Sequence, residues 1–153
     1  MKEAFEHTRK AELWQRRDLT ALKDQVLTMR QKMLDAHPNL TGLFDIKHDR
    51  GGIIDVEFIV QYLVLGHACA YPELTNNIGN IALLKLAGEL GLIHAETAER
   101  ALSAYREFRR VQHRLRLSGD SGLTGIPSTG SKSQKFARIE VDYLSDSPSA
   151  VLR

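Results

Sequence analysis

The chain has little of what would link it covalently or interrupt a helix. Cys69 is its one cysteine among 153 residues, which excludes an internal disulfide and is typical of a reducing compartment. Only four prolines are present, and no glycine precedes Gly42. Because glycine and proline are the residues that most often end helices, we expect long helices in this first part of the chain.

Long hydrophobic runs and an excess of one charge are also missing. Phe58 to Ala70, the longest nearly apolar stretch, is shorter than the about 20 residues that a membrane span needs. Met1 to Lys10 is rich in charge and lacks the apolar stretch of a signal peptide. The 21 basic and 19 acidic residues leave a net charge of +2, too balanced to indicate nucleic-acid binding. We therefore expect a cytoplasmic chain without a membrane or nucleic-acid partner.

The remaining composition is that of an ordinary folded protein, with 42% hydrophobic and 26% charged residues, and its length suits one domain over residues 1–153. Apolar residues recur at helical spacing, which predicts an all-α helical bundle of about five to six helices. We expect these helices in residues 3–17, from Leu19 (with Asp18 as N-cap) to just before His37, and in 53–71, 77–90, 95–117 and 133–144.

The same spacing predicts which side chains are buried. In the second helix the apolar stripe consists of Leu19, Leu22, Val26, Met29 and Met33. The later helices are expected to bury Val56, Ile59, Val60, Leu63 and Val64, then Ile81, Leu84, Leu86 and Leu90, then Ala98, Leu102, Tyr105, Phe108 and Leu115. Gly91 stands where a left-handed glycine would end a helix.

One short extended segment is expected at residues 43–47. Phe44 and Ile46 would face the helices, whereas Asp45 and Lys47 would point away from them. A single strand has no sheet partner, so this segment is either isolated or pairs with chain outside these 153 residues. Residues 118–131, which hold four glycines, are expected to form a flexible loop.

The most distinctive stretch runs from Asp45 to Phe58, with a charged turn, two adjacent glycines and the start of a helix. Gly51 and Gly52 permit backbone conformations closed to other residues, and free N–H groups at a helix N-terminus favour a phosphate. Lys47 would add a positive charge there. A tight turn without any ligand is the competing interpretation, since this is not a Walker-type loop and acidic residues suit a first helical turn in any case.

Other chemistry-bearing residues give weaker signals. The six histidines show no metal-binding spacing on one helix, and Cys69 is expected to be a small core residue rather than a nucleophile. No metal site or catalytic residue is predicted in the chain. A basic stripe near the end of the fifth expected helix fits either a solvated face or a docking surface; it consists of Arg106, Arg109, Arg110, Arg114 and Arg116.

The stretch FDIKHDRGGIIDVEFIVQYLVLGHA resembles the signature of bacterial glutamine-synthetase adenylyltransferases. That family has Asp-hydrophobic-Lys, then Gly-Gly-Ile, then Asp-hydrophobic-Glu-Phe. The matching residues are Asp45, Lys47, Gly51, Gly52, Ile53, Asp55, Glu57 and Phe58. The similarity extends over most of residues 20–117, and related uridylyltransferases of the PII signalling protein share a similar glycine pair.

The resemblance implies a helical domain from a long bifunctional enzyme. In each half a nucleotidyltransferase domain precedes a helical domain; one half transfers AMP from ATP to a tyrosine of glutamine synthetase, and the other removes it. The Asp55-Val56-Glu57 sequence is more similar to the C-terminal, adenylylating half. Implied partners are the upstream nucleotidyltransferase domain, glutamine synthetase and a PII-type protein, with ATP and Mg²⁺ as cofactors of the full-length enzyme.

Two departures from the family limit what this chain can do. The Gly-Ser and Asp-x-Asp signature whose carboxylates bind magnesium is absent, so the chain alone is expected to be inactive. Asn76, Asn77 and Ile78 stand where aromatic and basic residues are expected. The resemblance places Lys47, Gly51 and Gly52 nearest the nucleotide, while Asp45, Asp55 and Glu57 would orient the turn or face the protein substrate. The alternative is a non-catalytic helical module that binds a regulatory protein or glutamine synthetase.

Overall fold

The computed structural model describes residues 1–119 and 123–127, and its all-α architecture confirms the predicted class. The described part contains five α-helices, one 3-10 helix and two short strands. In chain order these are α1 (Lys2–Leu13), α2 (Leu19–Ala36), β1 (Leu43–Asp45), α3 (Ile53–His67), η1 (Pro72–Thr75), α4 (Gly79–Glu89), α5 (Ala95–Ser118) and β2 (Leu123–Pro127).

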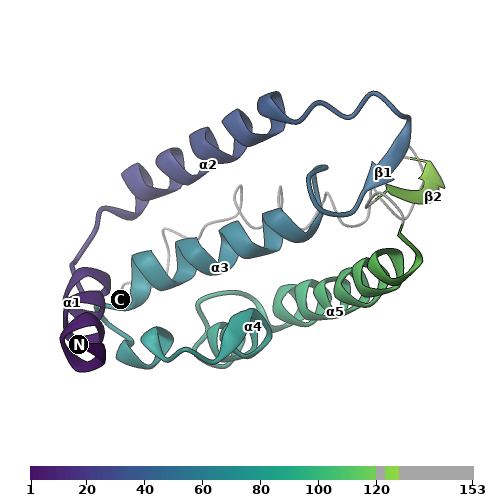
Figure 1. The fold of residues 1–153 in the computed structure, drawn as a ribbon. Helices are drawn as coiled ribbons and strands as arrows, with labels where there is room; N and C mark the ends of the chain where they lie inside the picture. The colour runs from purple at the N-terminus through teal and green to yellow at the C-terminus, as the bar shows by residue number, and fades with distance from the viewer. Residues whose placement is uncertain (120–122, 128–153) are drawn as a thin grey trace.

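Helix α3 is the centre of the fold, with α2 on one side and α4 and α5 on the other (Figure 1). A helix with apolar residues on most sides needs several neighbours, and α3 packs against α2, α4 and α5. Its buried residues include the predicted Val56, Ile59, Val60 and Leu63, and Val64 is partly buried. The opposing core residues Leu84, Leu102 and Phe108 are buried as predicted. The helix that begins directly after the glycine pair is therefore held rigidly.

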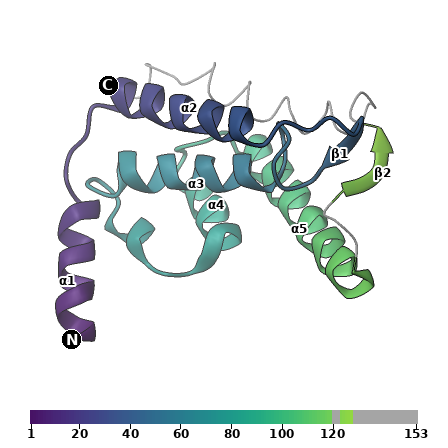
Figure 2. The same cartoon turned by 45° about the horizontal axis from the view of Figure 1, so that its top comes forward.

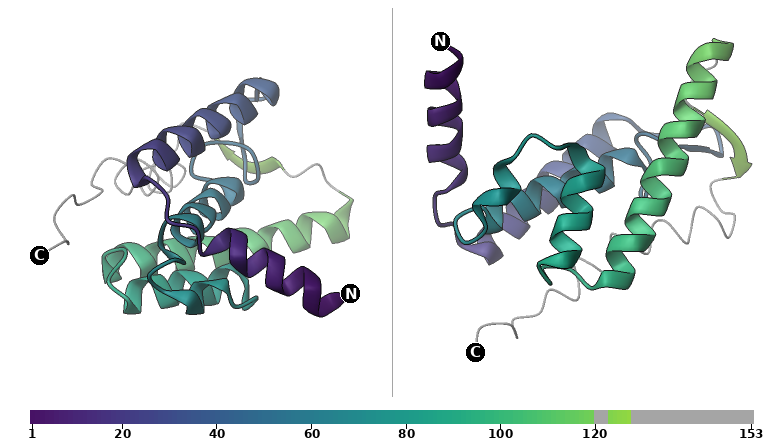
Figure 3. Two further views of the ribbon diagram at one scale, coloured as in Figure 1. Left: turned by 90° about the vertical axis from the view of Figure 1, so that its left-hand side faces the viewer. Right: turned by 90° about the horizontal axis from the view of Figure 1, so that it is seen from below.

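Helix α1 stands apart from this core, as Figures 2 and 3 show. None of its residues is buried, since its apolar residues are sparse among charged ones. The guanidinium group of Arg9 donates to the carbonyl oxygen of Thr75 at 2.8 Å, and that of Arg17 donates to the carbonyl oxygen of Leu65 at 3.3 Å. These polar contacts tie the first helix and its connection to the rest of the molecule.

Some helix ends follow local sequence signals, whereas α1 ends at Leu13, before the expected residue 17, and α3 also ends early. The Asp18 carboxylate caps α2 by accepting from the N–H groups of Thr20 and Ala21. Gly91, with φ of 70°, ends α4 in the left-handed conformation as predicted. The prediction that α3 continues to residue 71 was wrong, because the helix ends at His67. Tyr71, with φ of −129° and ψ of 80°, is already non-helical, as residues before a proline tend to be.

The predicted stripe of α2 is only partly buried. Leu22 is buried, whereas Leu19 is 40% and Met29 is 54% exposed. The residue that this helix does bury besides Leu22 is Arg30. The helix is therefore rotated so that the positions of Leu22, Val26 and Arg30, four residues apart, face α3.

The extended segment has a partner within the chain, contrary to both expected alternatives. Strand β1 pairs antiparallel with β2, with Leu43 opposite Pro127 and Asp45 opposite Leu123. Strand β2 lies inside residues 118–131, for which a loop was predicted from the glycine content; residues 120–122 and 128–131, like the helix predicted at 133–144, lie outside the described residues. The β-branched Thr124 and Ile126 favour extended backbone, and a strand 80 residues away supplies the pairing.

Candidate functional site

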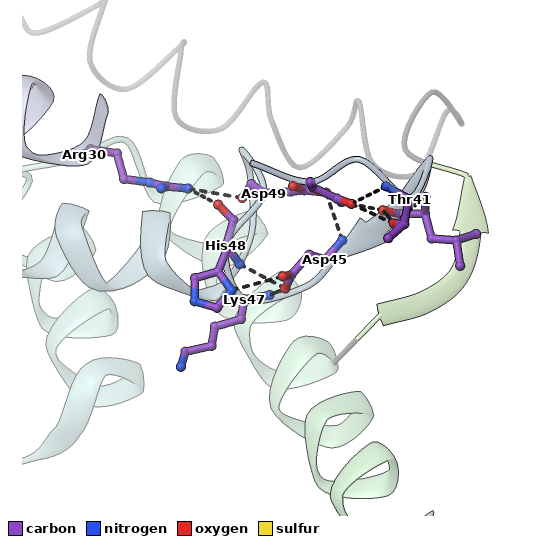
Figure 4. Close-up of polar contacts among 8 residues, drawn as sticks. Arg30, Thr41, Asp45, Lys47, His48 and Asp49 are labelled. Atoms are coloured by element: carbon purple, nitrogen blue, oxygen red, sulfur yellow. Dashed lines mark hydrogen bonds and ion pairs between the residues drawn. The ribbon is translucent and has the colours of Figure 1, made fainter. Parts of the chain in front are cut away.

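The turn that joins β1 to α3, residues 45–52, is built on the side chain of Asp45. Its carboxylate accepts from the N–H groups of Lys47 at 2.8 Å and His48 at 3.1 Å, and it pairs with His48 Nδ1 at 3.0 Å (Figure 4). Such side chain to backbone bonds fix a turn without a regular helix or sheet. Asp45 thus orients the turn, one of the two roles that the resemblance implied for it.

Hydrogen bonding also lowers the pKa of Asp45. Burial would raise the pKa of this carboxyl, but the bonds from Lys47 and His48 outweigh burial and hold the pKa below its ordinary value of 3.8. The carboxylate is therefore ionised over the whole neutral range. Asp49 adds a second support, since its carboxylate accepts from the Asp45 N–H at 2.9 Å and from Asn39 Nδ2 at 2.7 Å.

The two glycines are required for different physical reasons. Gly51 has φ of +80°, the left-handed region that favours glycine. Gly52 has φ of −85° and ψ of −168°, an ordinary extended conformation, but a Cβ there would lie 2.7 Å from the Ile46 carbonyl oxygen and 2.9 Å from that of Asp49. Both glycines therefore have a structural function, whether or not a ligand approaches them.

The N–H groups of residues 51–54, at the end of the turn and the start of α3, are bonded, so at these positions they are not the free groups that were expected. Gly52 N–H donates to the Asp49 carbonyl at 3.0 Å, Ile53 N–H to that of Ile46 at 2.8 Å and Ile54 N–H to that of Lys47 at 3.3 Å. Gly51 N–H donates to the Asp55 carboxylate. The turn folds back over the helix end, so its own oxygens occupy the donors that a phosphate would use.

Asp55 and Glu57 face different sides of α3, as two residues two positions apart on a helix must. Asp55 is 3% exposed and forms an ion pair with Arg30 of α2. Glu57 is half-buried on the other side, where its carboxylate lies 3.4 Å from the hydroxyl of Tyr105; that hydroxyl accepts from Asn80 Nδ2 at 3.1 Å. The burial of Asp55 fits the role of orienting the turn and leaves it no surface to offer a protein substrate.

Lys47 is the predicted site residue that reaches outward. Phe44 and Ile46 are buried, as the alternation predicted, and the Lys47 side chain is exposed and points away from the bonded turn (Figure 4). Among the described residues, no hydrogen bond or ion pair involves its ammonium group. The turn therefore presents an exposed positive charge from a hydrogen-bonded backbone.

Sequence reasoning missed the residue on which this turn depends most, Arg30. A signal was present: Arg30 stands four residues after Val26 and eight after Leu22, on the apolar stripe of α2. An arginine in such a stripe needs a buried acceptor, and Asp55 in the first turn of α3 supplies it.

The remaining candidates do not form a site. Cys69 is exposed, which corrects the prediction of a core residue: it lies beyond the end of α3, in the turn before Pro72. Within residues 1–119 and 123–127, no group of three or more His, Cys, Asp or Glu residues could hold a metal ion. No helix in this described part is long and apolar enough to cross a membrane.

Comparison with known proteins gives this arrangement a family. A family model described as "GlnD PII-uridylyltransferase" matches residues 20–133. A "Bifunctional glutamine synthetase adenylyltransferase/adenylyl-removing enzyme" from Nitrosomonas europaea is 64% identical over 151 residues, which are 99% of this chain and 16% of the relative. The enzyme of the same name from Nitrosomonas eutropha is also 64% identical, with the same coverage.

A third relative of that name, from Aromatoleum aromaticum, is 60% identical over 116 residues, covering 76% of this chain and 12% of its own length. The chain thus spans only 16% of the length of the first of these curated relatives. Since the family model covers most of the chain, and the relatives carry the name that the Asp45–Phe58 signature suggested, the chain belongs to the GlnD PII-uridylyltransferase family and is similar to its glutamine synthetase adenylyltransferases.

Proposed function

We propose that this chain is the helical domain of the C-terminal, adenylylating half of a glutamine synthetase adenylyltransferase. In the whole enzyme a tyrosine hydroxyl of glutamine synthetase attacks the α-phosphate of ATP, and pyrophosphate leaves. The names of the relatives support this reaction class, and their greater length leaves room for the catalytic domain. The chain itself holds no catalytic residue and is inactive alone.

The observation that carries the proposal is the exposed Lys47 ammonium on a fixed turn. An isolated ammonium suits a phosphate oxygen, because a charge-assisted hydrogen bond needs only one donor. The N–H groups of residues 51–54 are occupied, so we assign the contact with ATP to the Lys47 ammonium, while Gly51 and Gly52 shape the backbone beside it. We assign Mg²⁺ to carboxylates of the upstream nucleotidyltransferase domain, since the described residues offer no metal-binding cluster.

Partners follow from the same assignment. The Lys47 side of the turn would face the upstream nucleotidyltransferase domain, and the assembled enzyme would bind glutamine synthetase and a PII-type signalling protein. Glu57, on the opposite side of α3, is available to a protein partner through its exposed edge. We place all of these partners in the cytoplasm.

The test is the ATP dependence of AMP transfer by the full-length enzyme that contains this chain. Lys47→Ala removes one charge-assisted phosphate contact, worth about 1.5–3 kcal/mol, so kcat/KM for ATP should fall roughly tenfold to hundredfold. The thermal melt should not change, because the side chain is exposed. Lys85→Ala, which removes an exposed lysine from α4, is the matched control and should leave both quantities unchanged.

Unchanged kinetics in Lys47→Ala would return the turn to its structural interpretation, a bend that joins a strand to a helix. Transfer of labelled AMP by the isolated 153-residue chain would contradict the assignment of catalysis to another domain.

The alternative, a helical module that only binds a protein, has one specific observation in its favour. All five arginines of the stripe on α5 are exposed, so this face is available to an acidic partner.

A further inference from the structure

A buried ion pair links α2 to the turn, although the two are separate elements. Arg30 is 2% and Asp55 3% exposed; with Thr75 they are the buried polar residues of the described chain. Arg30 Nε donates to one carboxylate oxygen of Asp55. The other oxygen accepts the N–H of Gly51. One carboxylate thus joins α2 to the glycine pair.

The rest of the Arg30 guanidinium group holds the turn at a second place. Its Nη2 donates to the carbonyl oxygens of His48 at 2.8 Å and Asp49 at 3.2 Å (Figure 4). The turn is therefore held by hydrogen bonds on both sides of Arg50: Arg30 bonds residues 48–49, and Asp55 bonds Gly51. These three contacts come from one side chain pair on α2 and α3.

A buried ion pair of this kind contributes little net free energy to the packing of two helices. Desolvating an arginine and an aspartate offsets most of their attraction, and apolar residues of similar size would pack α2 against α3 at least as well. What apolar residues cannot do is direct two backbone carbonyls and one N–H group. The planar donors of Arg30 hold the two carbonyls, which the single point charge of lysine would not, and the Asp55 carboxylate holds the N–H group.

The geometry bears directly on Lys47. Its N–H group is held by Asp45, and the next two carbonyl oxygens along the chain are held by Arg30. The backbone that carries the Lys47 side chain is therefore fixed by two sets of hydrogen bonds, one from Asp45 within the turn and one from Arg30 of α2. A change at Arg30 would shift the turn relative to the helices without touching the ammonium group itself.

We propose that Arg30 is a positioning residue, which with Asp55 fixes the turn on α2 so that Lys47 meets the phosphates of ATP. This inference rests on the function proposed above for Lys47. It makes α2 part of the nucleotide site without any contact between α2 and the nucleotide.

The experiment is a double-mutant cycle in the full-length enzyme, with Arg30→Lys, Lys47→Ala and their combination. Arg30→Lys keeps the positive charge beside Asp55 but removes the planar set of donors that holds the two carbonyls. The KM for ATP should therefore rise about tenfold, which is an ordinary coupling between residues of one network, while kcat changes little. In the Lys47→Ala background the same change should have almost no further effect on KM. Arg100→Lys, at an exposed arginine of α5, is the matched control.

Hydrogen exchange of the backbone amides supplies a readout that activity does not. In Arg30→Lys the amides of residues 47–52 should exchange faster, while those of α4 and α5 keep the wild-type rate. Asp55→Asn, which neutralises the partner at nearly the same shape, should reproduce both the KM change and the local exchange if Arg30→Lys folds poorly.

The outcomes separate the two proposals. If Lys47→Ala raises KM but Arg30→Lys multiplies that effect independently, or lowers only the melting temperature, then Arg30 is structural and this inference is overturned while the role of Lys47 stands. If Lys47→Ala leaves kcat/KM for ATP unchanged, the role of Lys47 falls, and the positioning role falls with it.

Discussion

At the scale of single residues, Gly51 and Gly52 allow the backbone to fold back on itself for two different reasons. Gly51 supplies a positive φ, and Gly52 supplies the missing Cβ where two carbonyl oxygens approach. We expected Gly52 to be needed for a glycine-like conformation. The structure corrects the reason: its φ and ψ suit any residue, and close packing alone excludes a side chain.

Gly52→Ala should therefore destabilise the chain, and Gly66→Ala should not. The new Cβ at position 52 would lie 2.7 Å from a backbone oxygen, and such overpacking costs about 1–3 kcal/mol. At position 66, inside α3, the nearest atom is the end of the exposed, flexible Leu19 side chain, and alanine favours a helix interior by about 0.5–1 kcal/mol. Urea unfolding of both variants measures this contrast; equal stability of the two would contradict it.

At the scale of elements, helix α5 has one buried face and one basic face. Ala98, Leu102, Tyr105 and Phe108 pack into the core, as their spacing predicted. On the other side the stripe is solvated: Arg110 pairs with Glu107 at 2.6 Å, with side chains that are 67% and 49% exposed. Exposed pairs of this kind contribute little to stability.

Replacing Arg106 and Arg109 together by glutamine should change the free energy of unfolding by less than about 0.5 kcal/mol, because both side chains are exposed. Turnover by the full-length enzyme should also stay at the wild-type value. Chemical denaturation and an AMP-transfer assay check the two statements. Normal stability with a large loss of turnover would identify this face as a docking surface and favour the alternative function.

At the scale of the whole molecule, Asp45 and His67 make stability depend on pH in separate ranges. The pKa of Asp45 is below 3.8 in the folded chain, so its contribution is present above that pH and is lost as the pH falls through the lower, folded value. Burial at the end of α3 lowers the pKa of His67 below 6.5. Since the unfolded chain then takes up this proton first, acidification below about pH 6.5 favours unfolding.

His67→Gln should therefore flatten part of the acid limb of the stability curve. Between pH 7.5 and 5.5 the wild-type chain should lose more free energy of unfolding than the variant, because glutamine has no proton to take up. Urea unfolding across this range gives the difference between the two slopes. Parallel curves would mean that His67 titrates alike in the folded and unfolded chains.

Much of the architecture could be predicted because it depends on neighbours in the sequence. The spacing of Val56, Ile59 and Leu63 placed the central helix, Asp18 marked a helix start, and Gly91 marked a helix end. The Asp45–Phe58 signature gave the family. Each of these signals depends on residues that are close together in the sequence, so a short stretch of sequence is enough to recognise it.

What only the tertiary structure decided depends on segments that are distant in sequence. Arg30 and Asp55 are separated by 25 residues, and their pairing reveals that α2 holds the turn. The strand that pairs with β1 lies in a glycine-rich stretch. The N–H groups of residues 51–54, which were expected to be free, are bonded to oxygens of Ile46, Lys47, Asp49 and Asp55. Helical periodicity gives the face of one element, but the partner of a buried charge or of a strand edge is set by where the chain folds back, because only there do donors and acceptors meet.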